Sequence, residues 1–188
     1  MKKITDRSEQ FIENLIKLKA LKDLGRLAEL RRGLSEATRH QAWSTVQFIG
    51  GRLDSIVDVT IAGLFAIHPE HCGGLNLGAT WRKLRKEQLG SFPSEDRNRG
   101  SFEHRFNRLL ACSTKEELCE KLRSFITVAK SKGVPIDYFA LYQDVQYWEG
   151  GKSKIFWAQK YWENSPKKES KDHLQPNETT SEEALCRT

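Results

Sequence analysis

The sequence predicts an all-α fold of two small helical bundles, or lobes, joined by a connector and followed by a disordered tail. Apolar residues recur with the 3.6-residue period of helices along most of the chain. Glycines, prolines and capping residues interrupt this pattern at helix-length intervals. No β-type alternation of useful length occurs. The 188 residues, 38% of them hydrophobic, suit one domain or two small lobes with a core.

An N-terminal lobe is predicted over residues 1–89. Asp23 and Asp54 are the expected caps of its second and fourth helices. The fourth helix should end at His68, because the residue before a proline disfavours helical backbone. A glycine-rich loop follows over residues 70–78. The predicted helices of this lobe are 8–21, 24–34, 37–49, 54–68 and 79–89.

A C-terminal lobe is predicted over residues 101–163, after a connector at 90–100 that has turn residues and no apolar period. Ser101 is an expected cap, and Thr114 with Glu117 forms a capping-box pattern. The predicted helices are 101–111, 114–133, 136–148 and 153–162. Residues 164–188 are polar and offer almost nothing to bury, which predicts a disordered tail.

The charge balance indicates an anionic partner. The net charge is +6 and the sequence pI is about 9.2. From Glu163 onward there are six acidic and four basic residues, a balance of −2, which leaves about +8 on the body of the chain. Nucleic acid is the commonest partner of such a protein, and an inert basic surface is the alternative.

Several classes of protein are disfavoured. No apolar run approaches the roughly 18–20 residues that span a bilayer, and the N-terminus does not resemble a signal peptide, so we expect a cytoplasmic protein without membrane contact. The four cysteines form no CxxC pair, and disulfides are not expected.

Five groups of cations on or beside predicted helices are the candidate nucleic-acid contacts. Arg105 and Arg108 share one helix face, because they are three residues apart. Such cations bind phosphates without reading sequence, although each could equally belong to a solvated, ion-paired helix face. The candidates are Arg26, Arg31, Arg32, Arg82, Lys83, Arg85, Lys86, Arg105, Arg108, Lys130, Lys132, Lys152 and Lys154.

Catalysis and metal binding find little support. The segment HPEHC at residues 68–72 contains two histidines and a cysteine, but no second ligand pair follows at zinc-like spacing. No nucleophile elbow, phosphate-binding glycine loop or HExxH helix is present. We expect no enzyme activity, cofactor or metal. Aromatic residues are dense over 142–162, where core packing is favoured over base stacking.

Short motifs in a fixed order resemble the CasB family. Residues 25–33 (GRLAELRRG) resemble the family signature G-x-x-A-x-L-R-R-G. Between residues 35 and 53 the chain departs from the pattern. The ordered set covers roughly residues 10 to 162 and continues with FAIHP (65–69), NLG (76–78), RFNRLL (105–110), IDYFALYQD (136–144) and WA (157–158).

This resemblance implies a two-lobed helical protein that acts as the non-catalytic small subunit of the type I-E CRISPR surveillance complex, Cascade. Its partners would be the subunits CasA, CasC, CasD and CasE, the guide RNA, the target DNA and another copy of itself. Its role would be to stabilise guide–target pairing and the displaced strand. The resemblance points first to Arg32, Arg105, Arg108, Lys152 and Lys154 as contacts.

Two other interpretations stay open. The chain could be a free-standing helical protein that binds DNA or RNA without sequence preference. A sequence-specific regulator should have a recognition helix with base-reading side chains, and no clear case is present. An enzyme with a metal at the HPEHC segment is the remaining alternative.

Overall fold

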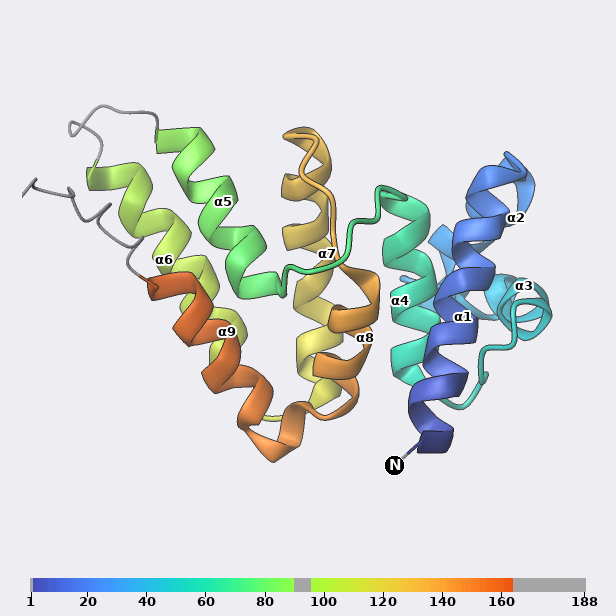
Figure 1. Ribbon diagram of the computed structural model, residues 1–188. Helices are drawn as coiled ribbons and strands as arrows, with labels where there is room; N and C mark the ends of the chain where they lie inside the picture. Colours follow the sequence, from blue (N-terminus) through green and yellow to red (C-terminus); the bar gives the residue numbers. More distant parts are fainter. Residues whose placement is uncertain (1, 90–95, 164–188) are drawn as a thin grey trace, which may run out of the picture.

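A computed structural model describes residues 2–89 and 96–163, and it confirms the all-α fold (Figure 1). Within the described residues no helix is both long and apolar enough to cross a membrane. In chain order the elements are α1 (Lys2–Ala20), α2 (Leu24–Arg32), η1 (Glu36–Ala42), α3 (Trp43–Phe48), α4 (Ile56–Ile67), α5 (Leu77–Leu89), α6 (Asp96–Leu110), α7 (Lys115–Ser131), α8 (Tyr138–Gln146), η2 (Trp148–Gly150) and α9 (Lys152–Trp162), where η marks 3-10 helix.

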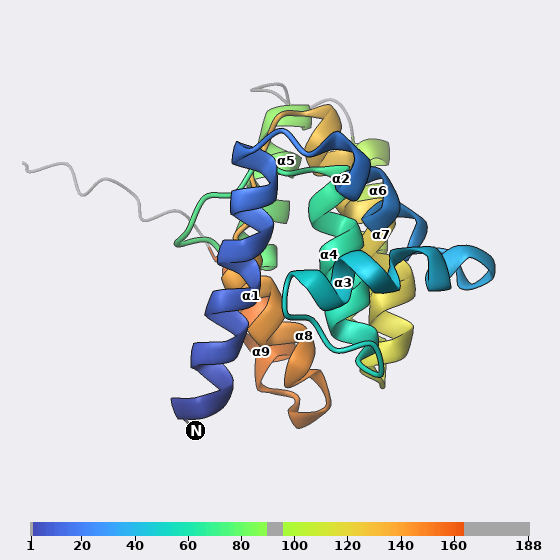
Figure 2. The same ribbon diagram turned by 90° about the vertical axis from the view of Figure 1, so that its right-hand side faces the viewer.

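Helix α4 is the centre of the N-terminal part of the molecule. Every residue from 57 to 66 is buried, as expected for a helix that is apolar on almost all sides. Helices α1, α2, α7 and α8 pack around it or around one another (Figures 1 and 2). The core that they form continues without a break into the C-terminal helices.

Helix α5 packs with the C-terminal helices α9 and α6 (Figure 1). An added Cβ at Gly78 would lie 2.1 Å from the carbonyl oxygen of Trp157, so only glycine allows this approach of α5 to α9. The Asn76 side chain accepts a hydrogen bond from the Ala79 N–H at 2.9 Å and donates one to the carbonyl of Phe156 at 3.4 Å. The NLG motif therefore starts α5 and fastens it to α9.

Several predicted boundaries are wrong in detail. Helix α6 begins at Asp96, so residues 96–100 are helical, although they were expected in the connector, and Ser101 lies inside the helix. The helix expected over 37–49 is a 3-10 segment followed by α3. Ser55, rather than Asp54, caps α4. The division into two lobes stays a prediction, and the predicted tail and residues 90–95 lie outside the described residues.

The HPEHC segment ties two loops together. His68 Nε2 lies 2.8 Å from the carbonyl oxygen of Val134, and the Tyr138 N–H donates to His71 Nδ1 at 3.2 Å. A single parallel β-bridge joins His71 to Ile136. The Tyr138 hydroxyl donates to the carbonyl of His68 at 2.7 Å. These histidines thus hold the loop after α4 against the loop before α8.

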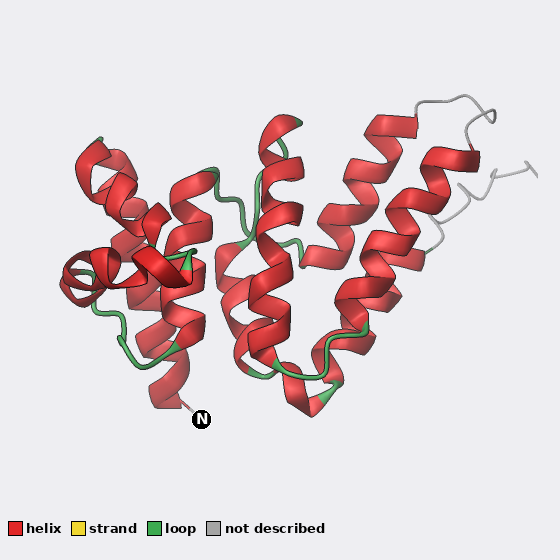
Figure 3. Ribbon diagram, turned by 180° about the vertical axis from the view of Figure 1, so that it is seen from behind, coloured by secondary structure: helices red, strands yellow, loops and turns green. Residues whose placement is uncertain are grey.

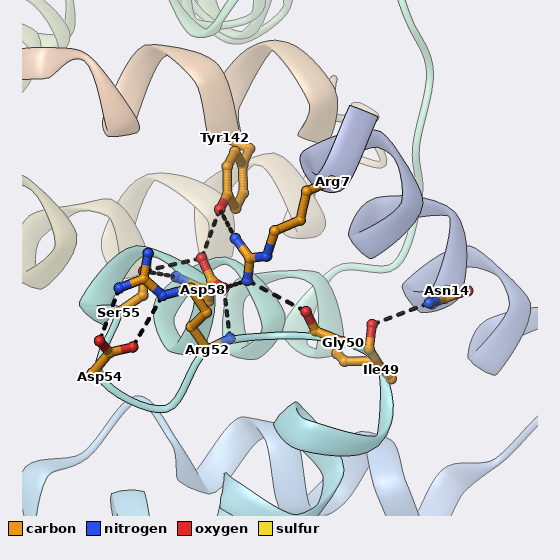
Figure 4. Close-up of polar contacts among 9 residues, drawn as sticks. All are labelled: Arg7, Asn14, Ile49, Gly50, Arg52, Asp54, Ser55, Asp58 and Tyr142. Carbon is orange, nitrogen blue, oxygen red and sulfur yellow. Dashed lines mark hydrogen bonds and ion pairs between the residues drawn. The ribbon is translucent and has the colours of Figure 1, made fainter. Parts of the chain in front are cut away.

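One buried carboxylate connects four segments (Figure 4). Asp58 in α4 has a side chain that is 1% exposed, and it forms an ion pair with Arg7 of α1. It accepts hydrogen bonds from the Tyr142 hydroxyl of α8 at 2.6 Å and from the Ser55 hydroxyl at 3.0 Å. The Arg52 backbone N–H donates a further bond at 2.7 Å. Because a buried charge is costly unless it is paired and hydrogen-bonded, this cluster fixes how α1, α4 and α8 meet.

The close approach at Gly78 predicts a selective effect of an added methyl group. We expect Gly78→Ala to lower the free energy of unfolding by about 2 kcal/mol or more, because the facing atom is rigid backbone. Gly100→Ala is the control, since nothing lies within 4 Å of its added Cβ, and it should be neutral or slightly stabilising. Urea denaturation of both variants measures the difference. Equal stability of the two variants would contradict the packing described for α5.

The Asp58 cluster predicts that the Tyr142 hydroxyl is important for stability. Tyr142→Phe should lower the free energy of unfolding by about 2 kcal/mol, because a buried carboxylate loses a charge-assisted hydrogen bond. Tyr147→Phe is the matched control, since this side chain is 50% exposed and its hydroxyl has no partner among the described residues. Denaturation midpoints that fall equally in both variants would disprove the role given to Asp58.

Candidate nucleic-acid interface

Cations from three separate elements gather on one face of the molecule, which we call the α7 surface. It consists of Arg105 and Arg108 of α6, Lys121 and Arg123 of α7, and Arg39 of η1. Figure 3 views the molecule from this side, with α7 between α6 and the α2–η1 segment. Cations as far apart in the sequence as Arg39 and Arg123 are thereby brought onto one surface.

Two neighbouring hollows define the shape of the α7 surface. The first, of about 130 Å³, lies between α6 and α7 and is lined by Arg105, Arg108 and Lys121. The second, of about 240 Å³, lies between α7 and the α2–η1 segment and is lined by Arg39 and Arg123. Glu120 lines both hollows, so the two adjoin at α7.

Helical spacing places the α6 cations on the surface. Phe106 and Leu109 are fully buried, whereas Arg105 and Arg108 are exposed. The two arginines are three residues apart and so project from the same side of the helix. The apolar residues of α6 thus fix the direction in which its cations point.

The helix α7 presents its polar side between the two hollows. Thr114 caps it by accepting a hydrogen bond from the Glu117 N–H, and Glu117 accepts one from the Ser113 N–H, which confirms the predicted capping pattern with the partner shifted by one residue. Lys121 Nζ lies 3.4 Å from Sγ of Cys112, which is two residues beyond the end of α6. Burial raises the pKa of the Cys119 thiol, which lines the second hollow, to about 11, so this thiol is neutral at pH 7.

The five cations of the α7 surface form no ion pair with any described carboxylate. Arg39 also has a buried Nε without a hydrogen-bond partner among the described residues. Three carboxylates line the same hollows, those of Glu36, Glu116 and Glu120. The surface therefore carries five positive and three negative charges, and its cations are available to an anion.

The predicted cations of α5 have a different setting. Arg82 contacts the carboxylate of Glu163 at 3.2 Å and its carbonyl at 2.9 Å. Arg85 pairs with Glu103 at 3.2 Å and lies over the ring of Tyr161. These two arginines join α5 to α9 and α6. Lys83 and Lys86 of the same helix are exposed.

The predicted cations of α2 contact their own helix, its capping residue, and the neighbouring elements η1 and α3. Arg26 pairs with Asp23 at 3.1 Å and stacks over the Phe48 ring. Arg31 donates to the carbonyl of Leu27, one turn earlier, at 3.1 Å. Arg32 is exposed and donates a hydrogen bond to the Gln41 side chain of η1 at 3.1 Å.

The remaining predicted cations lie at opposite ends of the molecule. Lys130 and Lys132 are exposed at the C-terminal end of α7, whereas Lys152 and Lys154 are at the start of α9. Figure 1 shows these two helix ends at the top and at the bottom of the view. Lys154 Nζ lies 5.2 Å from the centre of the Trp148 ring. The structure thus brings together Arg105 and Arg108 of the predicted set, and it does not gather all thirteen residues.

The sequence did not single out Lys121 and Arg123, and the departure from the family pattern put contacts from Arg39 and Arg52 in doubt. A signal for Arg123 existed, because Glu116, Glu120 and Arg123 share the polar side of their helix. Arg39 lies in the segment where the family resemblance is not defined. Nothing in the sequence indicated that η1 and α6 lie on either side of α7.

Most aromatic residues near the end of the chain belong to the core, as predicted. Tyr142, Trp148, Trp157 and Tyr161 are buried, and so is Trp81. Phe156, Tyr147 and Trp162 are instead about half exposed. None of these exposed rings lines the hollows of the α7 surface.

Comparisons with known proteins agree with this architecture. The family model described as CRISPR-associated protein Cse2 matches residues 26–162. The fold is similar to that of a CRISPR-associated protein of the Cse2 family from Thermus thermophilus, with 24% identity, a TM-score of 0.63, and coverage of 82% of this chain and 97% of that chain. It is also similar to CasB from Thermobifida fusca, with 17% identity, a TM-score of 0.60, and coverage of 84% and 97%. No curated protein matches the sequence.

Proposed function

The chain belongs to the Cse2 family of CRISPR-associated proteins, and from this premise we propose that it is the non-catalytic small subunit of the type I-E Cascade complex, where it holds nucleic-acid backbone on the α7 surface. The family match confirms the resemblance to CasB that the sequence motifs carried. The Cascade subunits CasA, CasC, CasD and CasE, guide RNA, target DNA and a second copy are its proposed partners.

One observation carries the proposal for nucleic acid. Arg105, Arg108 and Arg123 converge with Arg39 and Lys121 from different elements, yet none is neutralised by an ion pair with a described residue. Cations held together on a folded surface repel one another, and a phosphate backbone relieves that repulsion. Each phosphate bound also releases counterions, which favours association at low salt.

Contacts of this kind suit a role in which base pairing supplies the sequence information. Arginine and lysine bind phosphate without identifying the base. Exchange of DNA–DNA pairing for guide RNA–DNA pairing is nearly balanced in free energy, so a few backbone contacts can decide whether the opened DNA persists. The α7 surface would stabilise the target strand or the displaced strand in this way. Arg32 and the other predicted cations outside this surface are secondary candidates.

The purified chain should bind single-stranded and double-stranded nucleic acid weakly and without sequence preference. Binding should weaken steeply between about 50 mM and 200 mM salt, because the contacts are to phosphates. Fluorescence anisotropy with oligonucleotides of different sequence measures both properties. Tight binding that survives high salt, or a strong preference for one sequence, would contradict backbone recognition.

Reversal of two charges tests the α7 surface directly. Arg105→Glu with Arg108→Glu should weaken binding about tenfold or more at low salt and lower the salt slope by about 2, since two phosphate contacts are lost. Lys17→Glu with Lys22→Glu is the control, because both lysines are exposed, line neither hollow and are not among the predicted contacts, while the change in net charge is the same. In an assembled Cascade, the first variant should also reduce retention of opened DNA.

Measurements of folding distinguish a loss of nucleic-acid contacts from a loss of the folded state. Both arginines are exposed, so the circular dichroism spectrum and the melting temperature should stay close to those of the unmodified chain. An equal loss of binding in both double variants would mean that net charge alone, rather than the α7 surface, governs binding. A variant that unfolds would show that the arginines are structural.

A further inference from the structure

A carboxylate stands at the centre of the proposed binding surface. Glu120 is exposed on α7 and lines both hollows, with Arg105, Arg108 and Lys121 around the first and Arg39 and Arg123 around the second. Among the described residues, no other one lines both hollows. A phosphate backbone that follows the cations from α6 to η1 therefore passes the Glu120 carboxylate.

The Glu120 carboxylate does not serve as an ion-pair partner within the described part of the chain. Among the described residues it forms no ion pair, unlike Glu103 and Glu163, which pair with arginines of α5. Its role is thus not to fasten one helix to another. Glu116, one turn earlier on α7, lines the second hollow as well and adds to the negative potential there.

We propose that Glu120 is an electrostatic brake that lowers the affinity of the α7 surface for nucleic-acid backbone. The carboxylate repels a phosphate bound in either hollow and partly neutralises the arginines on both sides. The affinity for free nucleic acid is then low, because a phosphate backbone bound along the surface is repelled by this carboxylate. A strand that other subunits of an assembly already hold in place needs less affinity, and the cations of the α7 surface are sufficient to retain it. Discrimination of this kind needs a repulsive element as well as attractive ones.

This inference rests on the proposed function, because it names the residue that tunes the same surface. Two unit charges about 4 Å apart in water interact by an energy equivalent to a factor of about five in affinity. Removal of the carboxylate should therefore have a measurable effect without any new contact. The effect should fade at high salt, where exposed charges are screened.

Glu120→Gln keeps the shape of the side chain and removes its charge. We expect it to tighten binding of a fluorescein-labelled oligothymidylate about three- to fivefold at about 50 mM salt, and to make the salt dependence steeper. Glu149→Gln is the matched control, since Glu149 is exposed in η2, lines neither hollow and pairs with no described cation. The control should change the affinity by less than twofold. Both variants alter an exposed residue, so folding should be preserved, as a thermal melt will verify.

Each result has a separate meaning. If Glu120→Gln and Glu149→Gln tighten binding equally, the effect is one of net charge, and the electrostatic brake is overturned. If Glu120→Gln has no effect while the Arg105 and Arg108 reversal weakens binding, the brake is overturned and the proposed function stands. If neither the arginine reversal nor Glu120→Gln changes binding, the α7 surface is not the interface and both proposals fail.

Discussion

A buried carboxylate is the constraint on which the rest of this structure depends. Helix α4 is apolar almost throughout, yet Asp58 lies inside it with 1% of its side chain exposed. Such a charge is tolerated only where donors surround it. The Arg7 guanidinium, the Tyr142 hydroxyl, the Ser55 hydroxyl and a backbone N–H provide them, from segments up to 84 residues apart in the chain. The need to satisfy one side chain thus determines where α1 and α8 lie against α4.

The position of the α7 surface follows from this core. Helix α4 packs against α2 and α7, which places η1 on one side of α7. On the other side, α6 is held by α5 and by buried aromatic residues such as Phe106, whose ring stacks on that of Tyr161 at 4.2 Å between centroids. The five cations are therefore carried by helical elements that pack on this core. Arg105, Arg108 and Arg123 are exposed, whereas Arg39 and Lys121 are partly buried.

The basic segments differ mainly in whether their cations form ion pairs, and less in how many cations they contain. The densest basic run, in α5, has two arginines in ion pairs that join neighbouring helices. The less dense α6–α7–η1 group has cations without such partners among the described residues and has carboxylates interspersed. A dense basic run can therefore serve the fold, while a sparse one drawn from several elements can form an interface. The chain belongs to the Cse2 family. The function proposed for this group of cations is to contact nucleic-acid backbone while base pairing reads the sequence.

The sequence by itself determined the fold class, most of the helices, the caps at Thr114 and Asp23, and the family, because periodicity, capping and short motifs are local properties. The spacing of Arg105 and Arg108 also predicted that they lie on one helix face. Only the tertiary structure decided that Arg39 and Arg123 join them, that α5 packs with α9, and that the α5 arginines are ion-paired. Those facts depend on contacts between segments tens of residues apart, and a linear pattern of charges does not record which helices meet.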